Sequence, residues 1–240
     1  MKFGKCTYLE IKQKAEEGYI AIIPTGCTEQ QGPHATVDFD TWFAEELMDE
    51  VSERLLEKHG VKSLVLPAIP FGPTPEHVNF GSGYINIPQN LYEELIYSIF
   101  KSLSDQGFKK LILWRGCGGH YLDNVVSKFN ADNEGVAEVF NIPHPFYEVW
   151  CNCGDSSIEG GHSDSFTTSI GLYRHPEDIR VDKIVNPYST EPEWNDPNLD
   201  FSKYSKTGVI GDPTHASAEL GEKLWNEVVN KVVDMLNDLK

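Results

Sequence analysis

The stretch "YIAIIPTGCTEQQGPHATVDFDTWFAEELMDEVSERLLEK", residues 19–58, contains an apolar run, a polar loop and an amphipathic segment in direct succession. Residues 19–24 are short, β-branched and end at Pro-Thr-Gly, which is typical of a buried strand. In residues 41–58 an apolar stripe at helical spacing is formed by Trp42, Phe43, Leu47, Val51 and Leu55. Strand, loop and helix in this order are the repeating unit of a parallel sheet covered by helices.

The same strand pattern recurs at residues 63–72, 110–116 and 137–143. Further helical stripes are Leu91, Leu95, Ile96 and Phe100 in residues 90–103, and Leu220, Leu224, Val228, Val232 and Met235 in residues 216–239. We therefore predict a single α/β domain over residues 1–240, with a mostly parallel central sheet between two helical layers. Ligands of such sheets bind beyond the carboxyl ends of the strands. The Pro-, Asn- and Asp-rich segment 186–208 is too long for a plain connection and is predicted to be a surface loop or a lid.

Composition and charge narrow the classes of partner. The chain has 240 residues, is 40% hydrophobic and carries a net charge of −17, which disfavours contact with phosphate backbones and anionic membranes. No apolar run reaches the length of a membrane span, and the amino terminus lacks the features of a signal peptide, so we predict a cytoplasmic protein. The cysteines are Cys6, Cys27, Cys117, Cys151 and Cys153. Their odd number without an export signal indicates free thiols or metal ligands.

Polar loops follow three of the predicted strands, at residues 25–40, 72–87 and 116–120. Glu29 and Asp40 offer oxygen ligands, whereas Cys117 and His120 offer sulfur and nitrogen, a mixture that suits zinc better than magnesium or calcium. Simpler interpretations remain open for these residues. Asp40 could be a helix N-cap, Glu29 a turn residue, and Cys117 a small buried hydrophobe. A fourth cluster at residues 159–169 begins an expected helix, where His162 or Asp164 could be a cap or contact a ligand.

These loops resemble, in the same order, five motifs of the creatininase family, also called the creatinine amidohydrolase family. The first motif, near "GSTEQHGPHLP…D", appears as "GCTEQQGPHATVDFD" (26–40), and the second, near "EHxxFPGTISL", as "EHVNFGSGYINI" (76–87). "NGHGGN" appears as "RGCGGH" (115–120), and "HAGExETS" as "HSDSFTTS" (162–169). The last, "GVxGDPxxAsaexGexL", appears as "GVIGDPTHASAELGEKL" (208–224), so the resemblance spans nearly the whole chain.

The resemblance implies an α/β sandwich with a hydrolytic site that typically holds two divalent metals. Members hydrolyse cyclic or linear amides, and some cleave a carbon–carbon bond in a dehydro-inositol. Glu29 and Asp40 match the family's metal-binding Glu and bridging Asp. Three ligand positions differ from the motifs, because Gln31 and Cys117 stand where the family has His, and Thr167 stands where it has Glu. The resemblance also implies a homo-oligomer, with a ring-like hexamer expected.

We therefore predict a metal-dependent hydrolase with one ion favoured over two, zinc as the favoured metal, and manganese or iron as the other candidates. The predicted ligands are Glu29, Asp40, Cys117 and His120, and the predicted catalytic residues are His162 and Glu29. Expected substrate contacts are Gln31, His34, His77, Arg115, Tyr121 and Asp164. The expected substrate is a small polar ring, either a cyclic amide or a keto-inositol. The alternatives are a catalytically silent ligand-binding or assembly subunit, and a thiol enzyme that uses Cys27 or Cys117.

Overall fold

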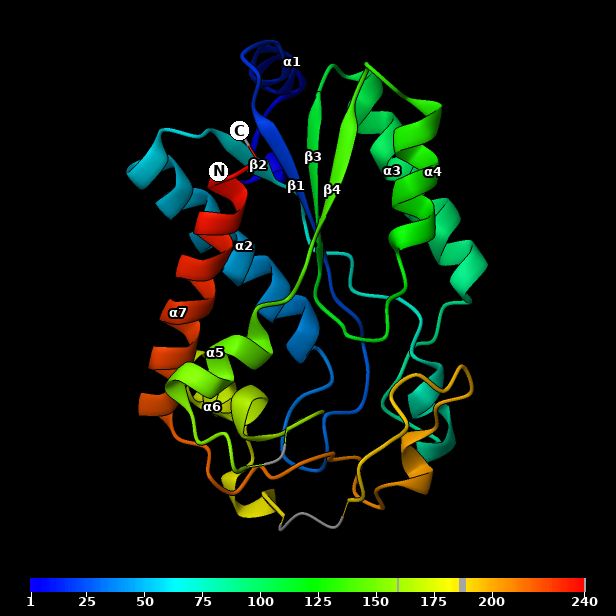
Figure 1. The fold of residues 1–240 in the computed structure, drawn as a ribbon, viewed down its shortest axis with the longest axis vertical. Coiled ribbons are helices and arrows are strands. Elements are labelled where there is room, and N and C mark those ends of the chain that lie inside the picture. The colour runs from blue at the N-terminus through cyan, green and yellow to red at the C-terminus, as the bar shows by residue number, and fades with distance from the viewer. Residues whose placement is uncertain (159, 186–188, 240) are drawn as a thin grey trace.

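The computed structural model describes residues 1–158, 160–185 and 189–239. Its central sheet has the strands β1 (Ile20–Thr25), β2 (Ser63–Val65), β3 (Lys110–Arg115) and β4 (Glu138–Ile142), in the spatial order β2-β1-β3-β4 (Figure 1). Every neighbouring pair is parallel, which confirms the predicted sheet. β2 is shorter than the predicted run 63–72, because prolines at positions 67 and 70 have no N–H to donate to a ladder.

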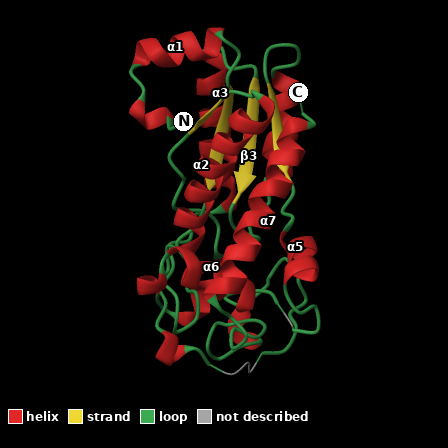
Figure 2. Ribbon diagram, turned by 90° about the vertical axis from the view of Figure 1, so that its left-hand side faces the viewer, coloured by secondary structure: helices red, strands yellow, loops and turns green. Residues whose placement is uncertain are grey.

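Helices lie on both faces of this sheet (Figures 1 and 2). One face carries α2 (Phe39–His59), α5 (Phe146–Cys153), α6 (Ser165–Arg174) and α7 (Ala218–Asn237). The other face carries α3 (Gln89–Asp105) and α4 (Asp123–Asp132), whereas α1 (Tyr8–Glu16) lies near the amino-terminal ends of the strands. Short 3-10 helices are η1 (Phe3–Lys5), η2 (Pro75–Phe80), η3 (Pro176–Asp178), η4 (Val181–Lys183) and η5 (Phe201–Lys203). The predicted three-layer α/β/α architecture is confirmed.

One hydrophobic core lies on each face of the sheet. Successive side chains of a strand point alternately into one core and the other. Ile20 and Ile22 of β1 join the core under α2 and α7, whereas Ala21 and Ile23 join the core under α3 and α4. Successive side chains of a strand point to opposite faces, so a strand that is buried on both sides reads as one continuous apolar run. This is why the strands were recognisable from their composition.

The predicted core face of α3 is partly wrong. Ile96 and Phe100 are buried as predicted, but Leu91 and Leu95 are 53% and 44% exposed. Each exposed leucine precedes a buried residue, Tyr92 or Ile96, by one position, which is about 100° around a helix. The buried face therefore includes the aromatic ring of Tyr92 in place of the two leucines. On α7, Leu224, Val228 and Val232 are fully buried, and Leu220 and Met235 are partly buried.

Helices α6 and α7 approach closely at Gly221. A β-carbon at this position would lie 1.9 Å from the carbonyl oxygen of Ser169, so no side chain fits between the two backbones. Their contact anchors the carboxyl half of α6 on α7. The loop that precedes α6, residues 161–164, is thereby held at the carboxyl end of the sheet, on the side where the loops gather (Figure 1).

The predicted loop 186–208 is described from residue 189 onward, and residues 186–188 lie outside the described part. Residues 189–208 contain only η5 as regular structure, and η5 packs against η2. Asn79 of η2 donates a hydrogen bond to Asp200 at 2.8 Å, which ties the two segments together. Within the described ranges, no helix combines the length and the apolar character that a membrane span requires.

Candidate functional site

Glu29 lies at the centre of the loop that follows β1, and its carboxylate is buried. The Cys117 thiol donates to Glu29 Oε2 at 3.5 Å, and His77 Nε2 faces the same oxygen at 3.4 Å. On the other side, His162 Nδ1 lies 3.6 Å from Glu29 Oε1. These partners come from the loop after β3, from η2 and from the loop before α6. Four segments that are distant in sequence therefore meet at one carboxylate.

Asp40 lies in the first turn of α2, whose N-cap position is occupied by Asp38. The capping interpretation of Asp40 is therefore wrong. Its carboxyl oxygen Oδ2 accepts hydrogen bonds from the Cys27 thiol at 3.1 Å and from the Gln31 amide at 2.9 Å. Gln31, which stands at a family ligand position, thus holds Asp40 through its amide nitrogen. Its amide oxygen is buried and has no hydrogen-bond partner among the described residues.

Three overlapping sets of donor atoms are close enough to hold a metal ion, with all ligand atoms of a set within 4.8 Å of one another. These sets are Cys27, Glu29, Asp40 and Cys117; Cys27, Cys117 and His120; and Glu29, His77 and His162. In the part of the chain that is described, the Nε2 atoms of His77 and His120 are buried without a hydrogen-bond partner. The residues fit a divalent ion, since buried carboxyl, thiol and imidazole donors are the ligand types that zinc accepts.

The two carboxyls differ in their electrostatics. Burial on its own would raise the pKa of Glu29, but its interactions with the His77 and His162 side chains outweigh burial, and the pKa lies well below its usual value. Burial likewise opposes the charged form of His77, yet the Glu29 carboxylate raises the pKa of this imidazole. Burial raises the pKa of Asp40 well above its usual value, and the negative charge on Glu29 adds to the effect. In the metal-free protein, these effects favour the ionised form of Glu29 and the protonated form of Asp40.

The hydrogen bonds of the histidines define their tautomers. His162 Nε2 lies 2.7 Å from the carbonyl oxygen of Gln30, which can only accept, so the proton is on Nε2. Nδ1, which faces Glu29, is therefore unprotonated. Burial lowers the pKa of His162 to about 4, so this ring is neutral at physiological pH. The amide nitrogen of Gln30 donates to His77 Nδ1 at 2.9 Å, which leaves the proton of neutral His77 on Nε2, toward Glu29.

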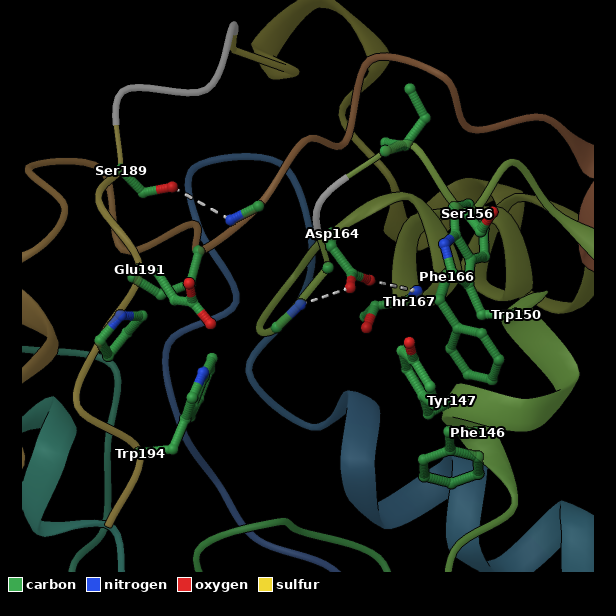
Figure 3. A pocket seen from close by; sticks show the side chains of 16 residues that line it. Phe146, Tyr147, Trp150, Ser156, Asp164, Phe166, Thr167, Ser189, Glu191 and Trp194 are labelled. Carbon is green, nitrogen blue, oxygen red and sulfur yellow. Dashed lines mark hydrogen bonds between the residues drawn. The ribbon is translucent and has the colours of Figure 1, made fainter. Parts of the chain in front are cut away.

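A cavity of about 160 Å³ opens beside these groups and is lined by Glu29, Gln31, Asp40, Cys117 and His162, among others. A second pocket of about 530 Å³ adjoins it and shares the wall residues Phe146, Gly161, Phe166 and Thr167. Its other labelled side chains include Tyr147, Trp150 and Trp194, so five of its 16 lining residues are aromatic (Figure 3). The donor cluster thus has room for a small group, with a larger aromatic pocket next to it.

The remaining predicted contacts lie in different places. His34 is fully buried, and its Nε2 lies 2.8 Å from the Thr168 hydroxyl, away from Glu29. Asp164 caps α6 by accepting from the backbone N–H of Thr167, and it also lines the aromatic pocket. Among the described residues, Arg115 and Tyr121 are absent from the lining of the 160 Å³ cavity. Tyr121 lines a separate pocket of about 780 Å³.

Cys27 was not among the predicted ligands, although the structure places it in two of the three donor sets. Its position two residues before Glu29 was a usable signal, because both belong to the same short loop. His77 was predicted as a substrate contact, and the structure places it against the Glu29 carboxylate. The sequence did not reveal this contact, because α2 and β2 separate η2 from the first loop along the chain.

The protein is thus an α/β/α sandwich, and the buried donor cluster at the carboxyl ends of its parallel strands is a candidate metal centre. Residues 4–236 match the family model described as "Creatinine amidohydrolase". The chain belongs to the creatininase family and is a hydrolase of that family.

Individual relatives differ in their named activities. A protein of Mycolicibacterium smegmatis named "Mycofactocin precursor peptide peptidase" is 26% identical over 90% of this chain and 84% of its own length. A "3-dehydro-scyllo-inosose hydrolase" of Thermotoga maritima is 26% identical over 99% of this chain and 81% of its own length. A solved structure described as "Creatininase Mn" superposes with a TM-score of 0.82 at 20% identity, covering 98% of this chain and 97% of the other. This last similarity concerns the fold.

Proposed function

We propose that the protein is a metal-dependent hydrolase that attacks the carbonyl group of a small polar ring, either a cyclic amide or a keto-inositol, with an activated water. One observation carries the proposal: Glu29 and Asp40, two buried or partly buried carboxyls, share a cluster with two thiols beside a cavity. Grouped carboxyls in a poorly solvated site repel one another unless a cation or a proton lies between them. A silent subunit would have no need of this arrangement.

The chain's own donors account for the binding of an ion. Glu29, Asp40 and Cys117 would hold it, and a ring nitrogen of His120 lies within 4.8 Å of the Cys117 sulfur. A bound divalent ion would supply an acidified water and would stabilise the negative charge that develops on the attacked carbonyl oxygen. One ion is proposed, because the amide of Gln31 and the hydroxyl of Thr167 replace charged or imidazole ligands of the family motifs.

His162 is the proposed general base. Its Nδ1 is unprotonated, faces Glu29 and borders the 160 Å³ cavity, so it can take a proton from water at that atom. The hydrogen bond from Nε2 to the carbonyl oxygen of Gln30 holds the ring and stabilises the imidazolium that forms. Phe201 lies 5.4 Å from the His162 ring and 5.1 Å from the His77 ring, measured between centroids, and shields both from bulk water.

Replacing His162 with Asn is expected to lower kcat by about 10²- to 10⁴-fold, the usual contribution of a general acid or base. Steady-state kinetics on a substrate found by screening lactams, keto-inositols and short peptides would measure the change. Metal content and the circular dichroism spectrum should stay as in the wild type. His215→Asn is the matched control, because the side chain of His215 is 55% exposed in the last motif. An unaltered kcat in the His162 variant would remove this residue from the mechanism.

Metal affinity is expected to rise with pH. In the metal-free protein, burial and the charge of Glu29 raise the pKa of Asp40 and so favour its protonated form. The neighbouring Cys27 side chain lowers the pKa of the Cys117 thiol, but burial and the Glu29 carboxylate outweigh it and raise this pKa to about 12. An ion must displace these protons, so the apparent association constant should increase about tenfold per pH unit for each proton released. Competition with a chromogenic chelator between pH 6 and 8 would measure it, and a flat profile would contradict the assignment of these ligands.

Metal analysis is the direct test of the proposal. Protein grown with ample metal is expected to contain about one ion per chain, and chelation should abolish hydrolysis until a divalent ion is returned. A stoichiometry near two would rule out the one-ion site. A stoichiometry near zero with full activity would rule out metal dependence altogether.

A second candidate substrate is a peptide. The adjoining 530 Å³ pocket is larger than a small ring requires, and its aromatic wall suits an apolar or aromatic side chain. The relative from Mycolicibacterium smegmatis is named a peptidase, which supports this option. Release of free amino groups from short peptides, compared with ring opening of lactams, would separate the two substrate classes. The hexamer implied by the family resemblance stays a prediction.

A further inference from the structure

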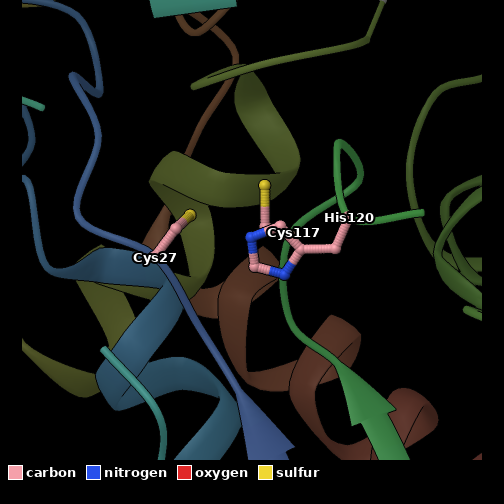
Figure 4. A group of neighbouring side chains, drawn as sticks. All are labelled: Cys27, Cys117 and His120. Carbon is pink, nitrogen blue, oxygen red and sulfur yellow. The ribbon is translucent and has the colours of Figure 1, made fainter. Parts of the chain in front are cut away.

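Two cysteines lie at equivalent places on neighbouring strands. β1 and β3 are adjacent and parallel, with Thr25 paired to Arg115 at the last position of the ladder. Cys27 and Cys117 each follow one of these paired residues by two positions. The register of the sheet therefore brings the two thiols together beyond its carboxyl edge, and Figure 4 shows both side chains next to His120. Their sulfur atoms and a ring nitrogen of His120 all lie within 4.8 Å of one another.

At both positions this chain has a cysteine, with a sulfur donor, where the family motif has an oxygen or nitrogen donor. The first motif, near "GSTEQHGPH", has Ser where this chain has Cys27, and "NGHGGN" has His where it has Cys117. We propose that Cys27 and Cys117 are both ligands of one ion, which makes the centre a dithiolate site that selects thiophilic divalent ions such as zinc over manganese. This inference deepens the proposed function and rests on it.

The contacts of the two thiols favour ligands over small core residues. Cys27 donates to Asp40 at 3.1 Å and Cys117 donates to Glu29 at 3.5 Å, so neither sulfur is surrounded only by apolar groups. His120 supplies a second, independent observation. It is completely buried, and its Nε2 has no hydrogen-bond partner among the described residues. Such a nitrogen is costly to bury unless it binds something, and an ion between it and the sulfurs would satisfy it.

The choice of metal follows from the softness of sulfur. Thiolate ligands favour zinc or iron, whereas manganese prefers carboxylate, carbonyl and water oxygens. A Ser and a His in place of the two cysteines would leave a harder donor set. The two thiols therefore act as the selectivity element of the centre, while Glu29 and Asp40 supply the oxygen donors toward the cavity.

Cobalt substitution under reducing conditions tests the proposal, because each cobalt–thiolate bond contributes near-ultraviolet charge-transfer absorption. The wild type should show this band, Cys27→Ser and Cys117→Ser should each reduce its intensity per bound ion to about half, and the double variant should lose it. Cys151→Ser is the matched control on the exposed face of α5 and should leave the band unchanged. An unchanged band in Cys27→Ser, or cobalt bound without the band in the wild type, would overturn the dithiolate assignment.

X-ray absorption at the zinc edge of the wild type answers the same question if a variant fails to fold. Two sulfur neighbours at about 2.3 Å are expected, and fewer than two would overturn the proposal. The variant carrying Cys27→Ser and Cys117→His, loaded from equal zinc and manganese, should shift its metal content toward manganese at least several-fold. No shift in a folded variant would refute the selectivity claim. If the wild type bound no ion under the same loading, the proposed function itself would be refuted, so the two failures are distinguishable.

Discussion

Replacing Glu29 with Gln is expected to reduce kcat/KM by about 10³-fold or more, on the scale of losing a principal electrostatic group of an active site. Glu29 belongs to two of the donor sets and touches Cys117, His77 and His162, so one neutral amide disturbs every partner at once. The amide keeps the shape of the side chain but removes its charge and one acceptor oxygen. The bound metal should fall in the same variant, measured by elemental analysis beside the kinetics.

Glu76→Gln is the matched control for this prediction. Glu76 is also buried and lies 3.9 Å from His77, but it belongs to none of the donor sets found among the described residues. Burial raises the pKa of Glu76, so an amide resembles its protonated form. Metal content should therefore stay near that of the wild type. Equal losses in both variants would mean that general disruption of the buried polar cluster, and not metal binding, explains the effect.

Replacing Trp114 with Ala is expected to lower the free energy of unfolding by about 3–5 kcal/mol, the usual cost of deleting a large buried aromatic side chain. Trp114 is completely buried on β3, in the core under α2 and α7. Its ring lies 5.1 Å from His144 and 6.0 Å from Phe146, measured between centroids. Alanine would leave a cavity directly behind the loop that carries Cys117. Urea unfolding monitored by circular dichroism would measure the loss.

Tyr147→Ala is the comparison for stability. The side chain of Tyr147 is 81% exposed, and surface substitutions usually change the free energy of unfolding by no more than about 0.5 kcal/mol. A loss below about 1 kcal/mol for Trp114→Ala, with an unchanged dependence on urea, would show that the surrounding core collapses to fill the space.

The fold was accessible from sequence because its strands are buried on both faces. Such strands are short, continuous and apolar, so β1, β3 and β4 are recognised within one residue of their observed bounds at both ends. Helix orientation was harder to predict. On α3, both Leu91 and Tyr92 are apolar, and a stripe through either is compatible with the spacing. Only packing against the sheet decides which one enters the core.

The site was partly accessible for a similar reason. Polar loops after parallel strands meet at one edge, which is why Glu29, Asp40 and Cys117 could be grouped in advance with His120. The role of His162 was predicted from the family resemblance. The structure brings His162 and the first three residues to the 160 Å³ cavity. Arg115 and Tyr121 flank the third loop, which carries Cys117, but neither lines that cavity in the described chain. Sequence proximity to a site residue does not determine the direction in which a side chain points.

By itself, the sequence determined the three-layer class, the family and the loops that carry the chemistry, because these depend on local pattern and motif order. Only the tertiary structure decided the partners of each group. The register of β1 and β3 places Cys27 beside Cys117, and the path of η2 brings His77 to Glu29. Such contacts join residues that are far apart along the chain, and their geometry depends on how sheet and helices pack together.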